Sequence, residues 1–192
     1  TLFVHAISAE DSLRMWEECV KLKADFAIAQ PGGMIASGFS EGFALDHANC
    51  EVDYLLTFHP RDHLKETVWK CSVSASAKHL DETADELSRR IKAIGAYQVI
   101  RSTDTVIDIT PQGCSKDAAV EAVLRLCGRS YDSAAAIGDS GSDVQMIRRS
   151  ALGVTLENGS AACRAAADHI VPSWEKEGSL ELIEALTAHS GA

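Results

Sequence analysis

The sequence predicts an α/β fold, in which a parallel sheet is covered by helices on both faces and a smaller α+β block is inserted into the chain. From residue 111 onward, apolar runs and helical patterns alternate strictly, which is typical of a parallel sheet. Between residues 39 and 110 the sequence is less apolar at first and contains strand patterns around one long helical pattern. The 192 residues are 46% hydrophobic and 24% charged, a composition that excludes a disordered or coiled-coil chain.

The part of the chain before Pro111 is expected to divide at Gly38, because the sequence after this residue is less apolar. Before Gly38, apolar runs around Pro31-Gly32-Gly33 predict a hairpin that follows a helix. After it, apolar residues at three-to-four spacing predict a helix that Gly95 closes. The expected elements are strands at 2–7, 25–29, 34–36, 51–58, 67–73, 97–100 and 105–109, and helices opening at residues 10–12 and running over 80–94.

The segment 111–192 predicts repeated helix and strand units. The expected helices cover 115–126, 143–149, 161–167 and 178–188, and the expected strands cover 134–137, 152–156 and 170–171. We therefore expect a core domain formed by residues 1–38 and 111–192 and a second domain formed by residues 39–110.

Charge and cysteine usage narrow the function classes. The chain carries 18 Lys and Arg against 28 Asp and Glu, a net charge of −10, which argues against a general nucleic-acid binder but leaves room for a small phosphorylated ligand. No apolar stretch approaches the ~20 residues that span a bilayer, and the start of the chain does not resemble a signal peptide. The six cysteines have no zinc-type spacing. We expect a cytoplasmic protein without a membrane partner.

The segment Gly138-Asp139-Ser140-Gly141-Ser142-Asp143 carries the sharpest chemical signal. It follows an apolar strand and precedes a helix, where ligands bind in open α/β sheets. Asp139 and Asp143 flank one tight turn and can converge on one Mg²⁺ ion. A polar turn in which Asp143 caps the helix is the alternative interpretation.

Lys116 is the second signal. It stands at the start of a helix that Ser115 caps, where the helix dipole disfavours a cation. A solvated surface lysine is the simpler interpretation. Lys116 and Asp139 are, however, separated by a single βα unit, so both can face the same phosphate.

Lys116 and the turn at 138–143 together resemble the motifs of a known family. Residues 107–186 resemble the C-terminal half of a haloacid dehalogenase superfamily phosphatase of the Cof type, a group that includes sugar-phosphate phosphatases. The family's third motif is a Lys in a stretch similar to residues 111–116, and its fourth is the Gly-Asp-x-x-x-Asp turn at 138–143. The following stretches at 152–154, 158–159 and 166–168 also match the usual run.

The resemblance implies roles for single residues. Lys116 would stabilise an aspartyl-phosphate and its nucleophile, Asp139 would ligate Mg²⁺, and Asp143 would support the metal directly or through water. Asn158 stands where the family places an Asn near the phosphate, although Glu157 replaces the usual Gly before it. Ser142 replaces a frequent Asn.

Residues 39–110 then resemble the cap that this subgroup inserts between its second and third motifs. A cap closes over the active site and supplies substrate contacts. The candidates for those contacts, His59, Arg61, Asp62 and His63, have a solvated loop as their simpler interpretation.

Two family motifs are absent or altered. No Asp-x-Asp occurs between positions 1 and 50, although the family carries its nucleophile in such a motif. Ser8 is the best match to the second motif, a phosphate-binding hydroxyl, but Ala9 and Glu10 depart from the usual Gly-Arg. Since the chain begins at Thr1, we expect it to lack one N-terminal βα unit of on the order of 30 residues.

The leading hypothesis is a Mg²⁺-dependent phosphatase for a small phosphomonoester such as a sugar phosphate, with the nucleophile outside the given chain. Two alternatives stay open. One is a non-catalytic pseudophosphatase that binds a phosphorylated ligand or a protein. The other is a fragment that persists as an oligomer. The sequence does not give the oligomeric state or the substrate.

Overall fold

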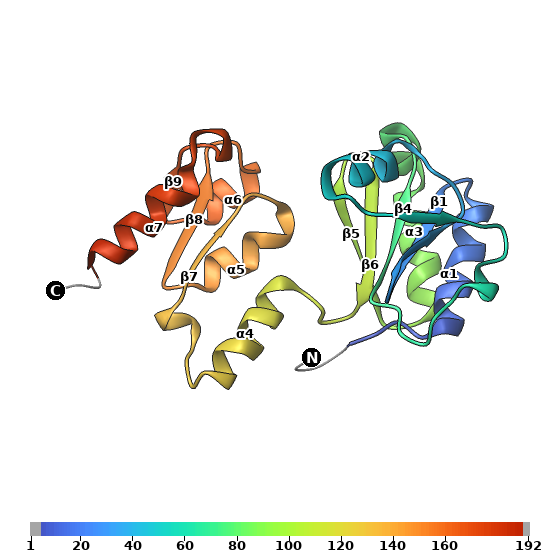
Figure 1. Cartoon of the computed structure of the whole chain (residues 1–192), viewed down its shortest axis with the longest axis horizontal. Helices are drawn as coiled ribbons and strands as arrows, with labels where there is room; N and C mark the ends of the chain where they lie inside the picture. The colour runs from blue at the N-terminus through green and yellow to red at the C-terminus, as the bar shows by residue number, and fades with distance from the viewer. Residues whose placement is uncertain (1–4, 190–192) are drawn as a thin grey trace. The chain divides into compact units, whose positions relative to one another are not determined.

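The computed structural model describes residues 5–189 and divides the chain into two compact units, Thr1–Cys114 and Ser115–Ala192. Figure 1 shows each unit as a sheet with its own helices. The α/β class predicted from the sequence is confirmed. Within the described residues, no helix is long and apolar enough to cross a membrane.

The first unit is built on a six-stranded sheet with the order β3-β2-β1-β4-β6-β5. All neighbouring strands in it are antiparallel except β2 and β3, which are parallel. Its elements are α1 (Ala9–Lys21), β1 (Asp25–Gln30), β2 (Gly33–Ala36), α2 (Glu41–Cys50), β3 (Tyr54–Leu56), the 3₁₀ turn η1 (Pro60–Asp62), β4 (Lys70–Ser74), α3 (Ala77–Ile94), β5 (Tyr97–Thr103) and β6 (Val106–Pro111).

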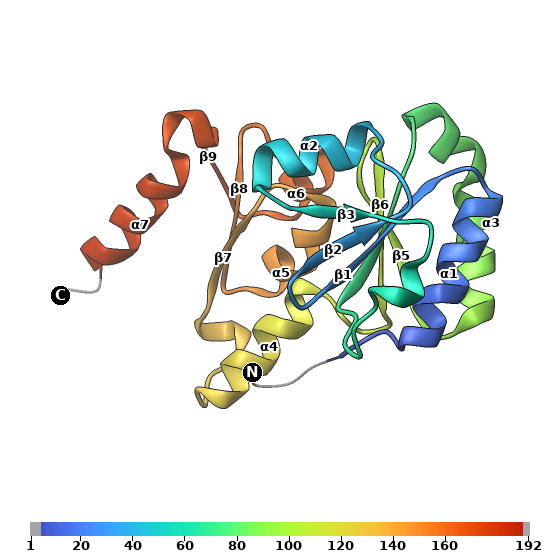
Figure 2. The ribbon, with the colours of Figure 1, turned by 45° about the vertical axis from the view of Figure 1, so that its right-hand side comes forward.

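The main core of this unit lies between one face of the sheet and the two helices α1 and α3, which run side by side in Figure 2. Alternate residues of β1, Phe26 and Ile28, are fully buried there, as the period of two along a strand requires. Trp16 of α1 meets Phe26 edge to face, with ring centroids 5.9 Å apart. On the opposite face, Phe43 of α2 packs against small residues of β1 and β2.

The second unit contains a parallel sheet with the order β7-β8-β9. Its core is small, with Val154, Leu156 and Val171 as the buried cluster. Its elements are α4 (Lys116–Leu126), η2 (Tyr131–Ser133), β7 (Ala135–Gly138), η3 (Gly141–Asp143), α5 (Val144–Arg149), β8 (Leu152–Leu156), α6 (Ala161–Ala166), β9 (His169–Val171), η4 (Trp174–Lys176) and α7 (Gly178–His189).

The division of the chain differs from the expected one. The expected core of 1–38 plus 111–192 separates residues 25–36 from the block 39–110, whereas β1 pairs along its length with β4, with Phe26 opposite Val73. Strands 25–36 thus belong to the same sheet as strands 70–111. The drop in apolar content after Gly38 precedes α2, a helix that the sequence patterns do not indicate, and it does not coincide with the boundary between the two units.

Several elements are shorter or shifted relative to expectation. Residues 51–58 form a strand only at Tyr54–Leu56, and the strand expected at 67–73 begins at Lys70. Of the strand expected at 2–7, residues 2–4 lie outside the described residues, and Ile7 makes an isolated antiparallel bridge to Val68.

Candidate functional site

The turn after β7 is organised around one buried carboxylate, Asp143. Its Oδ2 accepts hydrogen bonds from the backbone N–H groups of Asp139 (3.2 Å) and Ser140 (3.0 Å) and from Ser140 Oγ (2.8 Å). Ser140 and Asp143 form a reciprocal capping box around η3. Gly138 is required here, because a Cβ at this position would lie 2.6 Å from Asp143 Cγ. Asp143 is the N-cap residue of α5 but makes no side-chain hydrogen bond to that helix, and its Oδ2 instead closes the turn at the start of η3.

The other oxygen of Asp143 binds Lys116. Lys116 Nζ, at the first residue of α4, lies 2.6 Å from Asp143 Oδ1. The Asp143 side chain is 4% exposed and the Lys116 side chain 56% exposed. Burial raises the pKa of the Asp143 carboxyl, but the hydrogen bonds from Lys116 and Ser140 outweigh it, and the pKa lies below its ordinary value. Asp143 is therefore ionised near neutral pH, and Lys116 retains an exposed ammonium.

Asp139 lies on the surface of the same turn. Its side chain is exposed, and it has no hydrogen-bond or ion-pair partner among the described residues. Its backbone carbonyl accepts from Ser160 N at 2.8 Å, which brings the loop after β8 against the turn. Asn158 belongs to this loop and has an exposed side chain. The second unit thus brings together Lys116, Asp139, Asp143 and the Asn158 loop.

The donor set limits how a metal ion could be held. No group of three or more His, Cys, Asp or Glu side chains within residues 5–189 is arranged for a metal. Both oxygens of Asp143 are engaged in hydrogen bonds, which leaves Asp139 as the free carboxylate of the described turn. Because Mg²⁺ commonly uses one or two carboxylates plus water and substrate phosphate, these residues fit Mg²⁺ held mainly through Asp139.

Ser8 has a structural task in the first unit. It is the N-cap of α1, and its Oγ accepts from Asp11 N at 3.0 Å, which satisfies one free N–H of the first turn. Asp11 in turn accepts a hydrogen bond from Tyr97 Oη at 2.6 Å. Ser8 therefore belongs to a different compact unit from Lys116 and Asp139.

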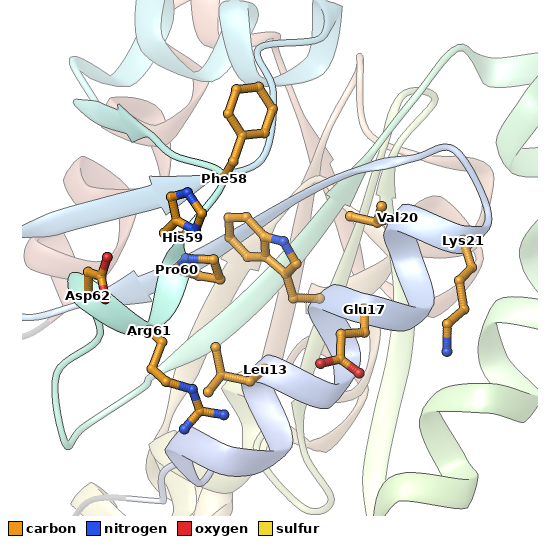
Figure 3. Close-up of a pocket in the computed structure, with 10 residues that line it drawn as sticks. Leu13, Glu17, Val20, Lys21, Phe58, His59, Pro60, Arg61 and Asp62 are labelled. Carbon is orange, nitrogen blue, oxygen red and sulfur yellow. The ribbon is translucent and has the colours of Figure 1, made fainter.

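Three of the four polar residues singled out between 59 and 63 line one groove of the first unit. The groove has a volume of about 670 Å³ and lies between α1 and the segment around η1 (Figure 3). Arg61 Nη2 is 3.7 Å from Glu10 Oε2, and both side chains are largely exposed. His63 is not among the lining residues, which are Leu13, Trp16, Glu17, Val20, Lys21, Phe58, His59, Pro60, Arg61 and Asp62.

Sequence reasoning missed a second set of polar residues beside Lys116. Arg149, the last residue of α5, binds Asp117 Oδ2 at 2.8 Å and Glu121 Oε2 at 2.6 Å. Its guanidinium lies 4.4 Å from the ring centroid of Tyr131. The spacing of Asp117 and Glu121, which places both acids on one helix face, is the one signal that could have indicated a cationic partner.

A curated relative, the chloroplastic endoribonuclease YBEY of Arabidopsis thaliana, is 35% identical over 85 residues, 44% of this chain and 15% of that protein. The phosphoglycolate phosphatase of Methanococcoides burtonii is 28% identical over 161 residues, 82% of this chain and 70% of that protein. The chain thus spans only a small part of the first of these relatives.

Solved structures show the same fold. A haloacid dehalogenase-like hydrolase from Bacteroides thetaiotaomicron aligns with a TM-score of 0.81 and 21% identity, over 96% of this chain and 69% of that chain. The family model for haloacid dehalogenase-like hydrolases matches residues 1–183. With nearly the whole chain matched by that model, the protein belongs to the haloacid dehalogenase-like hydrolase family.

Proposed function

We propose that this chain carries the phosphate- and Mg²⁺-handling side chains of a phosphatase that hydrolyses a small phosphomonoester, such as a sugar phosphate, through an aspartyl-phosphate. The single observation that supports it most is the constellation of Lys116, Asp139 and Asp143 at the carboxyl end of β7. Family membership and a relative named as a phosphoglycolate phosphatase agree with this reaction class.

Lys116 acts on the phosphate. Its side chain is more than half exposed while its ammonium is fixed on one side by Asp143, so it can bind a phosphoryl oxygen without a large change in position. A fixed positive charge at this place stabilises the negative charge that develops on the phosphoryl oxygens in the transition state. The Asn158 amide, on the neighbouring loop, is a second candidate for a hydrogen bond to the phosphate.

Asp139 holds Mg²⁺, and Asp143 holds the turn that presents Asp139. When bound, Mg²⁺ supplies a Lewis acid that neutralises charge on the phosphate. Asp143 Oδ2 binds the N–H of Asp139 itself, so the buried carboxylate orients the exposed one. We assign Asp143 to support of the metal site through this turn and through water.

The nucleophilic aspartate lies outside residues 1–192 in this proposal. Positions 1 to 50 contain no Asp-x-Asp, and a covalent mechanism requires its nucleophile. The first unit supplies the cap, with the residues around η1 as candidate substrate contacts. Ser8 Oγ would bind phosphate only after leaving its place as the N-cap of α1, where it accepts from Asp11 N.

Calorimetric binding tests the two roles separately. Asp139→Asn is expected to weaken Mg²⁺ binding at least about tenfold, since a hydrogen-bonding amide replaces the charged ligand; Asp132→Asn, an exposed acid of the same unit, is the control. Lys116→Met is expected to weaken inorganic phosphate binding by a similar factor, about tenfold, with Lys176→Met as control. Equal binding by each variant and its control contradicts the proposal.

The same titrations separate the phosphatase from a pseudophosphatase. A pseudophosphatase is expected to bind phosphate through Lys116 without any dependence on Mg²⁺. A phosphatase site is expected to bind phosphate more tightly when Mg²⁺ is present, because the ion and the phosphate share a ligand sphere.

A further inference from the structure

Helix α4 carries Lys116 but has little apolar packing to hold it in place. None of its side chains is buried, and Val123 and Leu126 are exposed. Since helices in globular proteins are usually held by an apolar face packed on a core, the orientation of α4 depends more than usual on its polar contacts.

The polar contacts of α4 converge on Arg149. Its two terminal nitrogens bind Asp117 at 2.8 Å and Glu121 at 2.6 Å, one helical turn apart. The buried Tyr131 contacts both Arg149 and Asp117. Its ring packs against the guanidinium, and its hydroxyl donates to the Asp117 carbonyl oxygen at 2.8 Å. A planar guanidinium can make these contacts together, whereas an ammonium cannot.

The contacts of Arg149 form one of two polar links between α4 and α5. Lys116 binds Asp143, which directly precedes α5, and Arg149 at the end of α5 binds the residue next to Lys116. Helix α5 has six residues and is about 9 Å long, a short rigid connection between the two links.

We propose that Arg149 is a positioning residue, which rests on the proposed function: by fixing the first turn of α4 against α5, it holds the Lys116 ammonium at Asp143, whose other oxygen binds the Asp139 N–H. It acts through Asp117 and does not touch substrate. Lysine at position 149 retains the charge but not the paired contacts, so Arg149→Lys is expected to restore part of the function that Arg149→Leu removes.

Chemical labelling of lysines tests the geometry without any ligand. The full chain is acetylated with a limiting reagent, and the rate at each lysine is read by mass spectrometry. In Arg149→Leu, Lys116 is expected to react about threefold faster, as its partly exposed ion pair is weakened, while Lys176, paired with Glu157 at 3.0 Å in the same unit, keeps its rate. Arg148→Leu is the matched control, an exposed neighbour without an ion pair in the described structure.

General loss of folding gives a different result. A merely structural role would raise the rates of Lys116 and Lys176 together, which overturns the proposal. An unchanged Lys116 rate in a folded Arg149→Leu protein also overturns it. If Arg149→Leu does not fold, the same comparison is made with Arg149→Lys, for which a selective increase at Lys116 is again the expected result.

Phosphate titration then connects the geometry to function. Arg149→Leu is expected to weaken phosphate binding about fivefold in the wild-type background and to have no effect when Lys116 is already Met. If Lys116→Met leaves phosphate binding unchanged, or the wild type does not bind phosphate, the proposed function fails while the labelling result still decides the positioning role. If Lys116→Met weakens binding and Arg149→Leu does not, the positioning role alone fails.

Discussion

Replacing Asp143 by Asn tests whether one buried carboxylate organises the whole turn. The change keeps the size and shape of the side chain but removes its charge. In the wild type, four hydrogen bonds reach this carboxylate, from Lys116, Asp139 and Ser140. If the Asn oxygen faces the backbone N–H groups, its NH₂ group faces the Lys116 ammonium, so two donors oppose each other.

The expected cost follows from these contacts. Loss of charge-assisted hydrogen bonds at a buried acceptor costs about 1.5–3 kcal/mol. The ion pair adds no more than about 1 kcal/mol, because the Lys116 side chain is more than half exposed. We therefore expect Asp143→Asn to lower the free energy of unfolding of the second unit by about 1.5–4 kcal/mol. The exposed Asp132→Asn is expected to change it by less than about 0.5 kcal/mol.

The pH dependence has a definite sign. Because the pKa of Asp143 is lower in the folded state than in the unfolded chain, its contribution is fully present above the unfolded pKa of about 3.9 and is lost as pH falls through the folded pKa. The stability difference between wild type and Asp143→Asn is expected to be constant above about pH 5 and to shrink in acid. Urea unfolding at several pH values, with hydrogen exchange over residues 135–156, measures it. A difference that is below about 0.5 kcal/mol at neutral pH, or that does not shrink in acid, refutes the assignment.

Two further substitutions test the same turn, and an activity assay tests where the nucleophile lies. Gly138→Ala is expected to cost about 1–3 kcal/mol, because its Cβ would collide with Asp143, whereas Gly141→Ala, with no atom within 4 Å of the added Cβ, is expected to be near neutral in the same urea titration. Thr155→Val removes the 2.8 Å hydrogen bond to the Gly138 carbonyl oxygen and is expected to cost about 1 kcal/mol by hydrogen exchange of β7. With Mg²⁺, residues 1–192 alone are expected not to hydrolyse p-nitrophenyl phosphate above background; turnover that Asp139→Ala abolishes would place the nucleophile within the chain.

Local patterns predicted the second unit well. Alternating apolar runs and helical spacing indicated strands at 134–137 and 152–156, which the structure has at Ala135–Gly138 and Leu152–Leu156. Each helix follows its strand closely in the chain, so sequence order and spatial order agree in this unit. The same order predicts that Lys116 and Asp139 can face one phosphate, and it does not indicate the direct ion pair between Lys116 and Asp143.

Nonlocal pairing explains what the patterns missed in the first unit. Phe26 lies opposite Val73, in a strand that β2, α2 and β3 separate from β1 along the chain, and no local signal identifies a strand partner at that distance. The expected boundary at Gly38 relied on composition, which does not report pairing. The role of Arg149 was missed for a similar reason, since its partners Asp117 and Glu121 lie on α4, with β7 between them and α5 in the chain. The hydroxyl of Ser8 is the reason for the prediction that it binds phosphate. In the structure that hydroxyl caps α1, a local role that residue type alone does not distinguish from phosphate binding.

The most direct test of the phosphatase assignment is made on the intact polypeptide that carries this sequence. Its mass is measured first, and then its Mg²⁺-dependent hydrolysis of p-nitrophenyl phosphate, with and without Asp139→Ala. We predict a mass above 20.6 kDa and an activity that the substitution abolishes. A mass of 20.6 kDa without turnover, or an activity that Asp139→Ala leaves unchanged, would contradict the account.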